Sequence, residues 1–133
     1  MDPIIYIVDD DQSFRTAVGR LLSASGYSIS LYGSGEELLA QLPASASGCI
    51  LLDLDMPGLS GLALQNRLAE MAPLLPIVFL TGHGNIRASV QAMKAGADDF
   101  LVKPATSEAL LHANAPALHR AASRRDKFDR IQA

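Results

Sequence analysis

The stretch Cys49–Gly58, which reads CILLDLDMPG, determines how the rest of the sequence is interpreted. Consecutive apolar residues that end in an acid, followed shortly by Pro-Gly, are typical of a strand buried on both faces of a sheet. Asp53 is the last residue of this strand. A carboxylate there is costly to hold unless something binds it, although an Asp before a turn can also bond nearby backbone. Taken alone, Asp53 leaves both interpretations open.

The remainder of the chain alternates between strand and helix patterns. Further apolar runs of strand length occur at 4–8, 77–80 and 100–102, and polar and apolar residues alternate at 28–32, as in a half-exposed strand. Apolar residues at helical spacing follow the runs, and Ser34 and Ser60 stand where helix caps are expected. The helix after Ser60 is expected to bury Leu64, Leu68 and Met71. Such alternation predicts an α/β fold, a parallel sheet covered by helices on both faces.

Composition limits the classes of protein that fit. The 133 residues suit one domain, 49% of them are hydrophobic, and the net charge of −3 is too mild to indicate a polyanionic partner. No apolar run approaches the roughly 20 residues needed to cross a bilayer, and the N-terminus lacks the basic residues of a signal peptide. We therefore expect a cytoplasmic protein without direct nucleic-acid or membrane contacts, with the lone Cys49 in its core.

Polar residues stand at the carboxyl ends of several predicted strands, where ligands bind in sheets of this kind. They are Asp9, Asp10, Asp53, Thr81 and Lys103. Three carboxylates that converge would repel one another, so the site should hold a cation, and oxygen ligands on an open rim favour Mg²⁺ over Ca²⁺.

A carboxylate beside Mg²⁺ and a lysine is placed to accept a phosphoryl group. Lys103 and the metal would offset charge on the transferring oxygens, and the Thr81 hydroxyl could donate to one of them. Gly82 leaves room for the phosphoryl donor. A surface lysine and a turn threonine are ordinary explanations for Lys103 and Thr81 taken singly, but not for the whole set.

Four motifs together resemble the receiver domain of response regulators. They are Val8-Asp9-Asp10, Leu52–Pro57 with Gly61, Thr81-Gly82, and Phe100–Pro104. The chain is most similar to FixJ-type receivers of regulators that end in a LuxR-type DNA-binding domain, from about Ile4 to Leu111. The resemblance implies a flavodoxin-like, doubly wound sheet of five parallel strands in the order 2-1-3-4-5.

The resemblance also implies a role for each acid. Asp53 would be the phosphoacceptor and a metal ligand. Asp10 would bind Mg²⁺ directly, Asp9 through water, and Asp55 through its backbone carbonyl.

Other residues would contact the phosphoryl group or respond to it. Lys103, Thr81 and Gly82 would contact it, and Thr81 and Phe100 would form the switch pair. The Lys103–Pro104 bond is expected to be cis, because X-Pro is the only bond where cis is cheap and a sharp turn would aim the ammonium at the acceptor.

The family further implies partners for the chain. The phosphodonor would be a sensor histidine kinase. A receiver at 1–115 would be followed by a helical linker at 116–133 leading to a LuxR-type output domain, which would control transcription. The surface of the last strand and helix would change on phosphorylation and could form a homodimer. Beyond its own phosphorylation and dephosphorylation, we expect no enzyme activity.

Some residues depart from the family pattern. Asp55 and His83 each lie two residues beyond a key residue, at positions that vary in the family and tune the dephosphorylation rate, so the phosphoryl lifetime is left open. Ala105 replaces a bulkier residue. Pro116 removes a hydrogen bond inside the last helix and clashes with the His112 carbonyl, so that helix is expected to kink or to break in two.

Alternative functions have less support. The segment Leu51–Asp55 also resembles the nucleophile motif of haloacid-dehalogenase-like phosphatases, but Pro57 stands where that motif has Thr or Val, and the strand is third in the chain instead of first. A pseudo-receiver that never takes phosphate usually lacks a rim residue, and none is missing here. The basic tail, 119–133, could touch nucleic acid, but without a recognition pattern a solvated helical linker is favoured.

Overall fold

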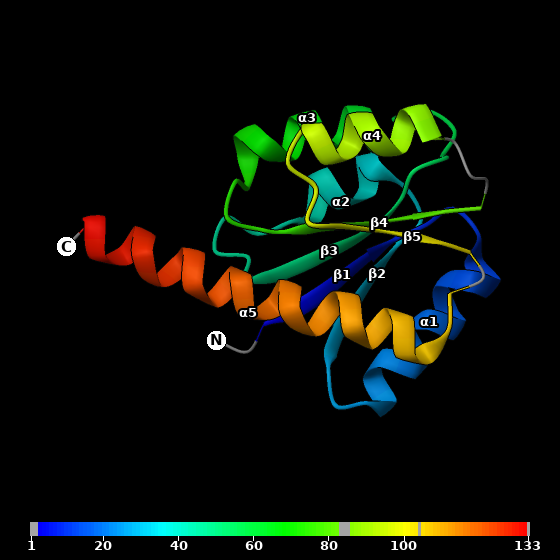
Figure 1. Cartoon of the computed structure of the whole chain (residues 1–133), viewed down its shortest axis with the longest axis horizontal. Coiled ribbons are helices and arrows are strands. Elements are labelled where there is room, and N and C mark those ends of the chain that lie inside the picture. The colour runs from blue at the N-terminus through cyan, green and yellow to red at the C-terminus, as the bar shows by residue number, and fades with distance from the viewer. Residues whose placement is uncertain (1–2, 83–85, 104, 133) are drawn as a thin grey trace.

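The computed structural model describes residues 3–82, 86–103 and 105–132. It contains one parallel sheet with the strand order β2-β1-β3-β4-β5 (Figure 1), which confirms the predicted fold class. The strands are β1 (Ile4–Val8), β2 (Ser28–Tyr32), β3 (Gly48–Asp53), β4 (Ile77–Thr81) and β5 (Asp99–Val102). Every residue of β3 and β4 is buried, as expected for central strands with continuous apolar sequences.

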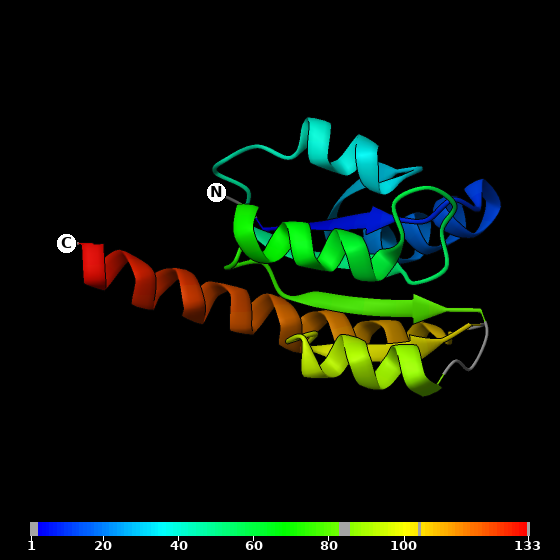
Figure 2. The ribbon, with the colours of Figure 1, turned by 90° about the horizontal axis from the view of Figure 1, so that it is seen from above.

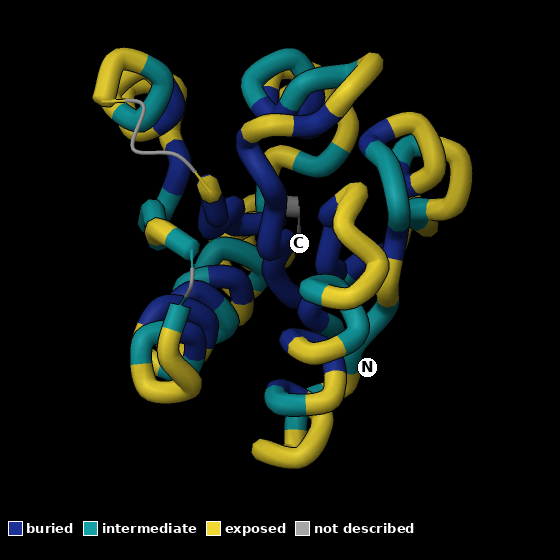
Figure 3. Tube along the Cα trace, turned by 90° about the vertical axis from the view of Figure 1, so that its right-hand side faces the viewer, coloured by how far each residue is buried: buried dark blue, intermediate teal, exposed yellow. Residues whose placement is uncertain are grey.

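Helices cover both faces of the sheet (Figure 1). They are α1 (Gln12–Ala24), α2 (Gly35–Gln41), α3 (Gly61–Met71), α4 (Ile86–Lys94) and α5 (Ser107–Gln132). α1 and α5 pack one apolar cluster against the sheet, and α2, α3 and α4 pack another on the opposite face. The strands β1, β3 and β4 form the buried centre of the molecule (Figure 3). Within the described ranges, no helix has both the length and the apolar character needed to cross a membrane.

The helix starts follow the cap residues in the sequence. The Ser34 hydroxyl accepts from the Glu37 N–H at 3.1 Å, and the Ser60 hydroxyl accepts from the Ala63 N–H at 3.2 Å. One burial prediction is wrong, since Met71 is 52% exposed. It lies in the last turn of α3, beside a cleft that Phe128 also lines, so nothing of the sheet covers it.

Pro116 does not break α5, which contradicts one of the two outcomes expected for it. The helix runs for 26 residues through Pro116, and Figures 1 and 2 show it without a sharp bend. Pro116 and His112 are both exposed, so the carbonyl that loses its partner lies on the solvent side, where water can satisfy it. Ala113 and Ala117, on the buried side, continue to pack on the sheet.

The second half of α5 is held against the domain. Arg120 Nε lies 2.7 Å, and Arg124 Nη2 2.9 Å, from Oδ2 of Asp98, whose side chain is only 5% exposed. Arg125 Nη2 donates to the Ala46 carbonyl at 3.3 Å. This part of the tail is therefore packed, and the expectation of a solvated helix is wrong for it. The C-terminal end of α5 projects beyond the sheet (Figure 2).

Candidate functional site

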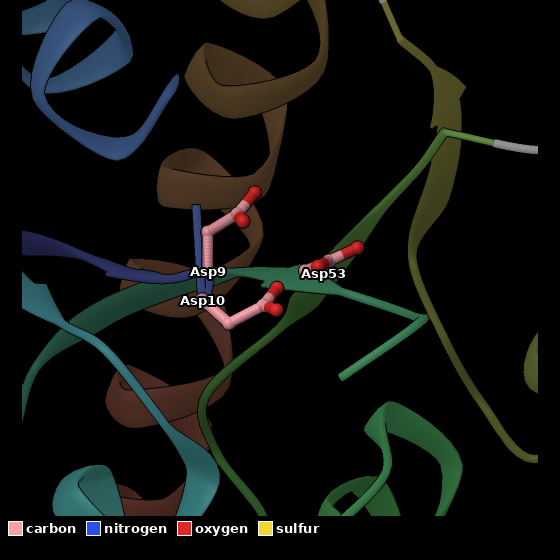
Figure 4. A group of neighbouring side chains, drawn as sticks. All are labelled: Asp9, Asp10 and Asp53. Carbon is pink, nitrogen blue, oxygen red and sulfur yellow. The ribbon is translucent and has the colours of Figure 1, made fainter. Parts of the chain in front are cut away.

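Three carboxylates meet at the carboxyl edge of the sheet, as predicted. Asp9 and Asp10 follow β1, and Asp53 ends the neighbouring β3, which pairs with β1 in register from Ile4–Gly48 to Val8–Leu52. One carboxylate oxygen from each acid lies within 4.8 Å of the others (Figure 4). Asp9 and Asp53 are 1% and 3% exposed, whereas Asp10 is exposed. Two buried acids thus stand beside one that solvent reaches.

Lys103 reaches this cluster from the end of β5. Its Nζ lies 2.7 Å from Asp9 Oδ2 and 3.7 Å from Asp53 Oδ1. The ammonium also stands 4.3 Å from the centre of the Phe14 ring, on the ring face. The predicted approach of Lys103 to Asp53 is confirmed, but the shorter ion pair is with Asp9.

The electrostatic environment opposes ionisation of Asp53. Burial, with the charge of Asp9, raises the pKa of Asp53 to about 7, and Lys103 only partly offsets the rise. Burial alone would lower the pKa of Lys103, but the hydrogen bond and charge of Asp9, with the charge of Asp53, raise it overall. One ammonium therefore faces several carboxylates, and a hard cation bound to their oxygens would relieve the excess negative charge.

Thr81 ends β4 and is completely buried. Its hydroxyl donates to Asp55 Oδ2 at 2.9 Å, while the Asp55 N–H donates to Asp53 Oδ1 at 3.3 Å. The structure thus brings Thr81 to the site, but with a hydrogen bond to Asp55 that sequence reasoning did not predict.

Two glycines near the site have different surroundings, close packing at Gly61 and, among the described residues, free space at Gly82. A Cβ at Gly61 would lie 2.7 Å from the Asp53 carbonyl oxygen, so only glycine allows α3 to start against the end of β3. Among the described residues outside its chain neighbours, a Cβ at Gly82 would meet Lys103 Cδ, at 4.0 Å, and nothing closer. These residues thus leave room at Gly82, where the sequence predicts that a phosphoryl donor enters.

Phe100, the other predicted switch residue, is half-buried in β5 and packs against the cluster beneath α4. Ala105 packs against the opposite cluster, beneath α1 and α5. His83 and Pro104 lie outside the described residues, so the cis bond expected at Lys103–Pro104 stays a prediction.

Sequence reasoning missed two residues that shape the site. Arg15 Nη1 donates to the Asp9 carbonyl at 2.6 Å, and Phe14 supports the Lys103 ammonium. In the sequence, Phe14 lies at helical spacing with Val18 and Leu21, as a core residue would, and no motif singles out Arg15. The available signal is their position in the first turn of α1, directly after Asp9–Asp11, where side chains can fold back over the sheet edge.

Comparison with known proteins agrees with the geometry. The family profile described as "response regulator receiver domain" matches residues 5–115. The response regulator protein TodT of Pseudomonas putida is 41% identical over 128 residues, which cover 96% of this chain and 56% of TodT. The transcriptional regulatory protein FixJ of Bradyrhizobium diazoefficiens is 40% identical over 100 residues, covering 75% and 49%. The chain thus spans about half the length of these curated relatives.

Solved structures give the same result. The response regulator StyR superposes with a TM-score of 0.93 at 38% identity, over 99% of this chain and 67% of StyR. The solved structure of FixJ-N gives a TM-score of 0.80 at 33% identity, over 92% of this chain and 95% of that chain. With its acidic cluster, lysine and sheet order, the chain belongs to the response regulator receiver domain family and is a receiver of two-component signalling.

Proposed function

We propose that the chain accepts a phosphoryl group on Asp53 from a sensor histidine kinase in a Mg²⁺-dependent reaction. The observation that carries this proposal is the position of the buried Asp53 carboxylate, within 4.8 Å of the Asp9 and Asp10 oxygens and 3.7 Å from Lys103 Nζ.

The donor set fits a hard divalent cation, because every candidate ligand atom is an oxygen. Asp10 and Asp53 would bind Mg²⁺ directly, the Asp55 carbonyl would add a ligand, and Asp9 would act through water. The short ion pair from Asp9 to Lys103 supports the indirect role of Asp9, since one of its oxygens is already engaged. When bound, Mg²⁺ would supply positive charge to the transferring phosphoryl oxygens.

The transfer itself requires an ionised nucleophile that the phosphoryl donor can reach. An Asp53 oxygen would attack phosphorus, an O–P bond would form, and the bond from phosphorus to the donor would break. Lys103 would offset the charge on a phosphoryl oxygen, and the open space at Gly82 would admit the donor. Thr81 would donate to a second phosphoryl oxygen once it leaves Asp55.

Incubation with acetyl phosphate and Mg²⁺ is expected to add one phosphoryl group, because small acyl phosphates can replace the kinase as donor. Intact-mass spectrometry measures the added mass. Excess chelator should reduce the labelled fraction at least tenfold. Equal labelling with and without chelator would contradict the proposed metal dependence.

The output is proposed to be a change in the surface formed by α4, β5 and α5. Val90, Met93 and Val102 on this surface are each 45–54% exposed. Phe100 lines a hollow with Val90 and Met93, and its ring would turn further inward when Thr81 moves toward the phosphoryl group. Burying more of that ring would contribute about 1–2 kcal/mol, comparable with the gaps between two-state conformers.

Phosphorylation is therefore expected to convert a monomer into a weak homodimer through this surface. Sedimentation velocity over a concentration series measures the change. Thr81→Ala, which takes phosphate but lacks the hydroxyl that responds to it, should stay monomeric. Fully phosphorylated wild type that remains monomeric at high concentration would refute the dimer. A partner domain would then have to recognise the changed surface.

We further propose that the receiver, expected at 1–115, and the helical segment 116–133 belong to a longer transcriptional regulator with a LuxR-type output domain. Support comes from the relatives, since the match covers only 56% of TodT and 49% of FixJ, and from the description of FixJ as a transcriptional regulatory protein. We expect cytoplasmic location and no turnover of phosphomonoesters, which a colorimetric phosphatase assay would check.

A further inference from the structure

The hydrogen bond between Thr81 and Asp55 links the predicted switch residue to a side chain with no assigned role. The buried Thr81 hydroxyl donates to Asp55 Oδ2 at 2.9 Å. A hydroxyl carries one proton and cannot donate fully to two acceptors at once. Asp55 is in turn tied to the acceptor, because its N–H donates to Asp53 Oδ1. Any movement of Thr81 toward Asp53 must therefore give up the bond to Asp55.

We propose that the Asp55 carboxylate is a positioning residue that holds the Thr81 hydroxyl in the unphosphorylated chain. A phosphoryl oxygen on Asp53 must then compete with Asp55 for the Thr81 proton. The holding contact stands on the observed geometry, and the competition rests on the proposed function.

This arrangement makes Asp55 oppose the switched conformation in two separable ways. Its carboxylate accepts a charge-assisted hydrogen bond that is lost on switching, and its negative charge repels a phosphoryl group nearby. Asp55→Asn removes the charge but keeps an oxygen acceptor of similar size, whereas Asp55→Ala removes both. Comparing the two variants isolates the hydrogen bond, and the exposure of Asp55 makes both substitutions structurally mild.

The first experiment examines the resting protein without phosphate or metal. Scalar couplings measured by NMR report the χ1 rotamer of Thr81. Wild type and Asp55→Asn are expected to share one dominant rotamer, and Asp55→Ala should populate a second one substantially. An unchanged rotamer in Asp55→Ala would overturn the proposal, because the carboxylate would then not be holding Thr81.

The second experiment uses beryllium fluoride with Mg²⁺ as the phosphoryl mimic and measures its dissociation constant by fluorescence or NMR titration. Asp55→Ala should bind the mimic on the order of three- to tenfold more tightly than Asp55→Asn, less than a buried charge-assisted bond would give because Asp55 is exposed. In the Thr81→Val background, which lacks the donor, the two Asp55 variants should agree within about twofold.

The two experiments separate the possible failures. If beryllium fluoride still binds Asp55→Ala more tightly than Asp55→Asn in the Thr81→Val background, the proposal is overturned, since Asp55 would then act on the mimic directly. If wild type binds no beryllium fluoride at all, the proposed phosphoacceptor function fails, while the Thr81 rotamer in the resting protein still decides whether Asp55 positions it.

Discussion

Asp53→Asn is expected to abolish phosphoryl incorporation and, at the same time, to stabilise the metal-free protein at neutral pH. The loss follows because the amide cannot act as the nucleophile. The gain follows because Asp53 is buried beside Asp9, and ionising it costs free energy in the folded state. One substitution should therefore remove the function and raise the stability, as is common at functional sites where like charges lie close together.

The pH dependence has a defined sign. The pKa of Asp53 is raised to about 7 in the folded chain, above the value of about 3.9 for an unfolded Asp. The folded state thus binds the proton more tightly, and the contribution of Asp53 to stability is fully present below about pH 4 and is lost as pH rises to about 7. The unfolding free energy of Asp53→Asn should exceed that of wild type by about 2 kcal/mol at pH 8, and by little at pH 4.

Urea unfolding at several pH values, with chelator present, measures this difference. In a second series with Mg²⁺ in place of the chelator, the metal should stabilise wild type more than Asp53→Asn, because the variant has lost a charged ligand. A difference in unfolding free energy that stays constant between pH 4 and pH 8 would show that folding does not raise the pKa of the Asp53 carboxylate. Full phosphoryl labelling of Asp53→Asn would move the acceptor to another residue.

Asp98→Ala is expected to loosen the second half of α5. Asp98 is the shared partner of Arg120 and Arg124, and its carboxylate is nearly buried where the chain enters β5. Removing it should lower the free energy of unfolding by about 2 kcal/mol, below the cost of breaking a fully buried pair because both arginines can turn to solvent. Hydrogen exchange of backbone amides in residues 118–130 should accelerate, since the segment would lose both ion pairs and keep mainly the packing of Ala121 and the Arg125 bond to the Ala46 carbonyl.

The same helix offers a matched control. Asp126 and Arg130 form an ion pair at 2.6 Å in which both side chains are more than half exposed. Asp126→Ala should therefore change stability by less than about 0.5 kcal/mol. If Asp98→Ala and Asp126→Ala have the same small effect and leave exchange in α5 unchanged, the Asp98 contacts do not hold the helix.

The sequence by itself determined the elements, their order along the chain and the edge at which the functional residues gather. β3 and β4 are short apolar runs that have no other stable place than the middle of a parallel sheet. Because parallel strands end at the same edge, Asp9, Asp10 and Asp53 had to meet there. The order of the strands within the sheet came from the resemblance to receivers, since alternation alone permits several orders.

The tertiary structure decided how the side chains at that edge are paired. Spacing placed Lys103 near the acids, but only the folded geometry makes Asp9 its closer partner. The Thr81 bond to Asp55 joins residues 26 positions apart, and no local pattern encodes it. The same holds for Pro116: the sequence shows a helix-breaking residue, whereas exposure of Pro116 and packing on the opposite side of α5 decide that the helix continues. Local preference is weak compared with the burial of a long helix face, so contacts between distant segments settled these points.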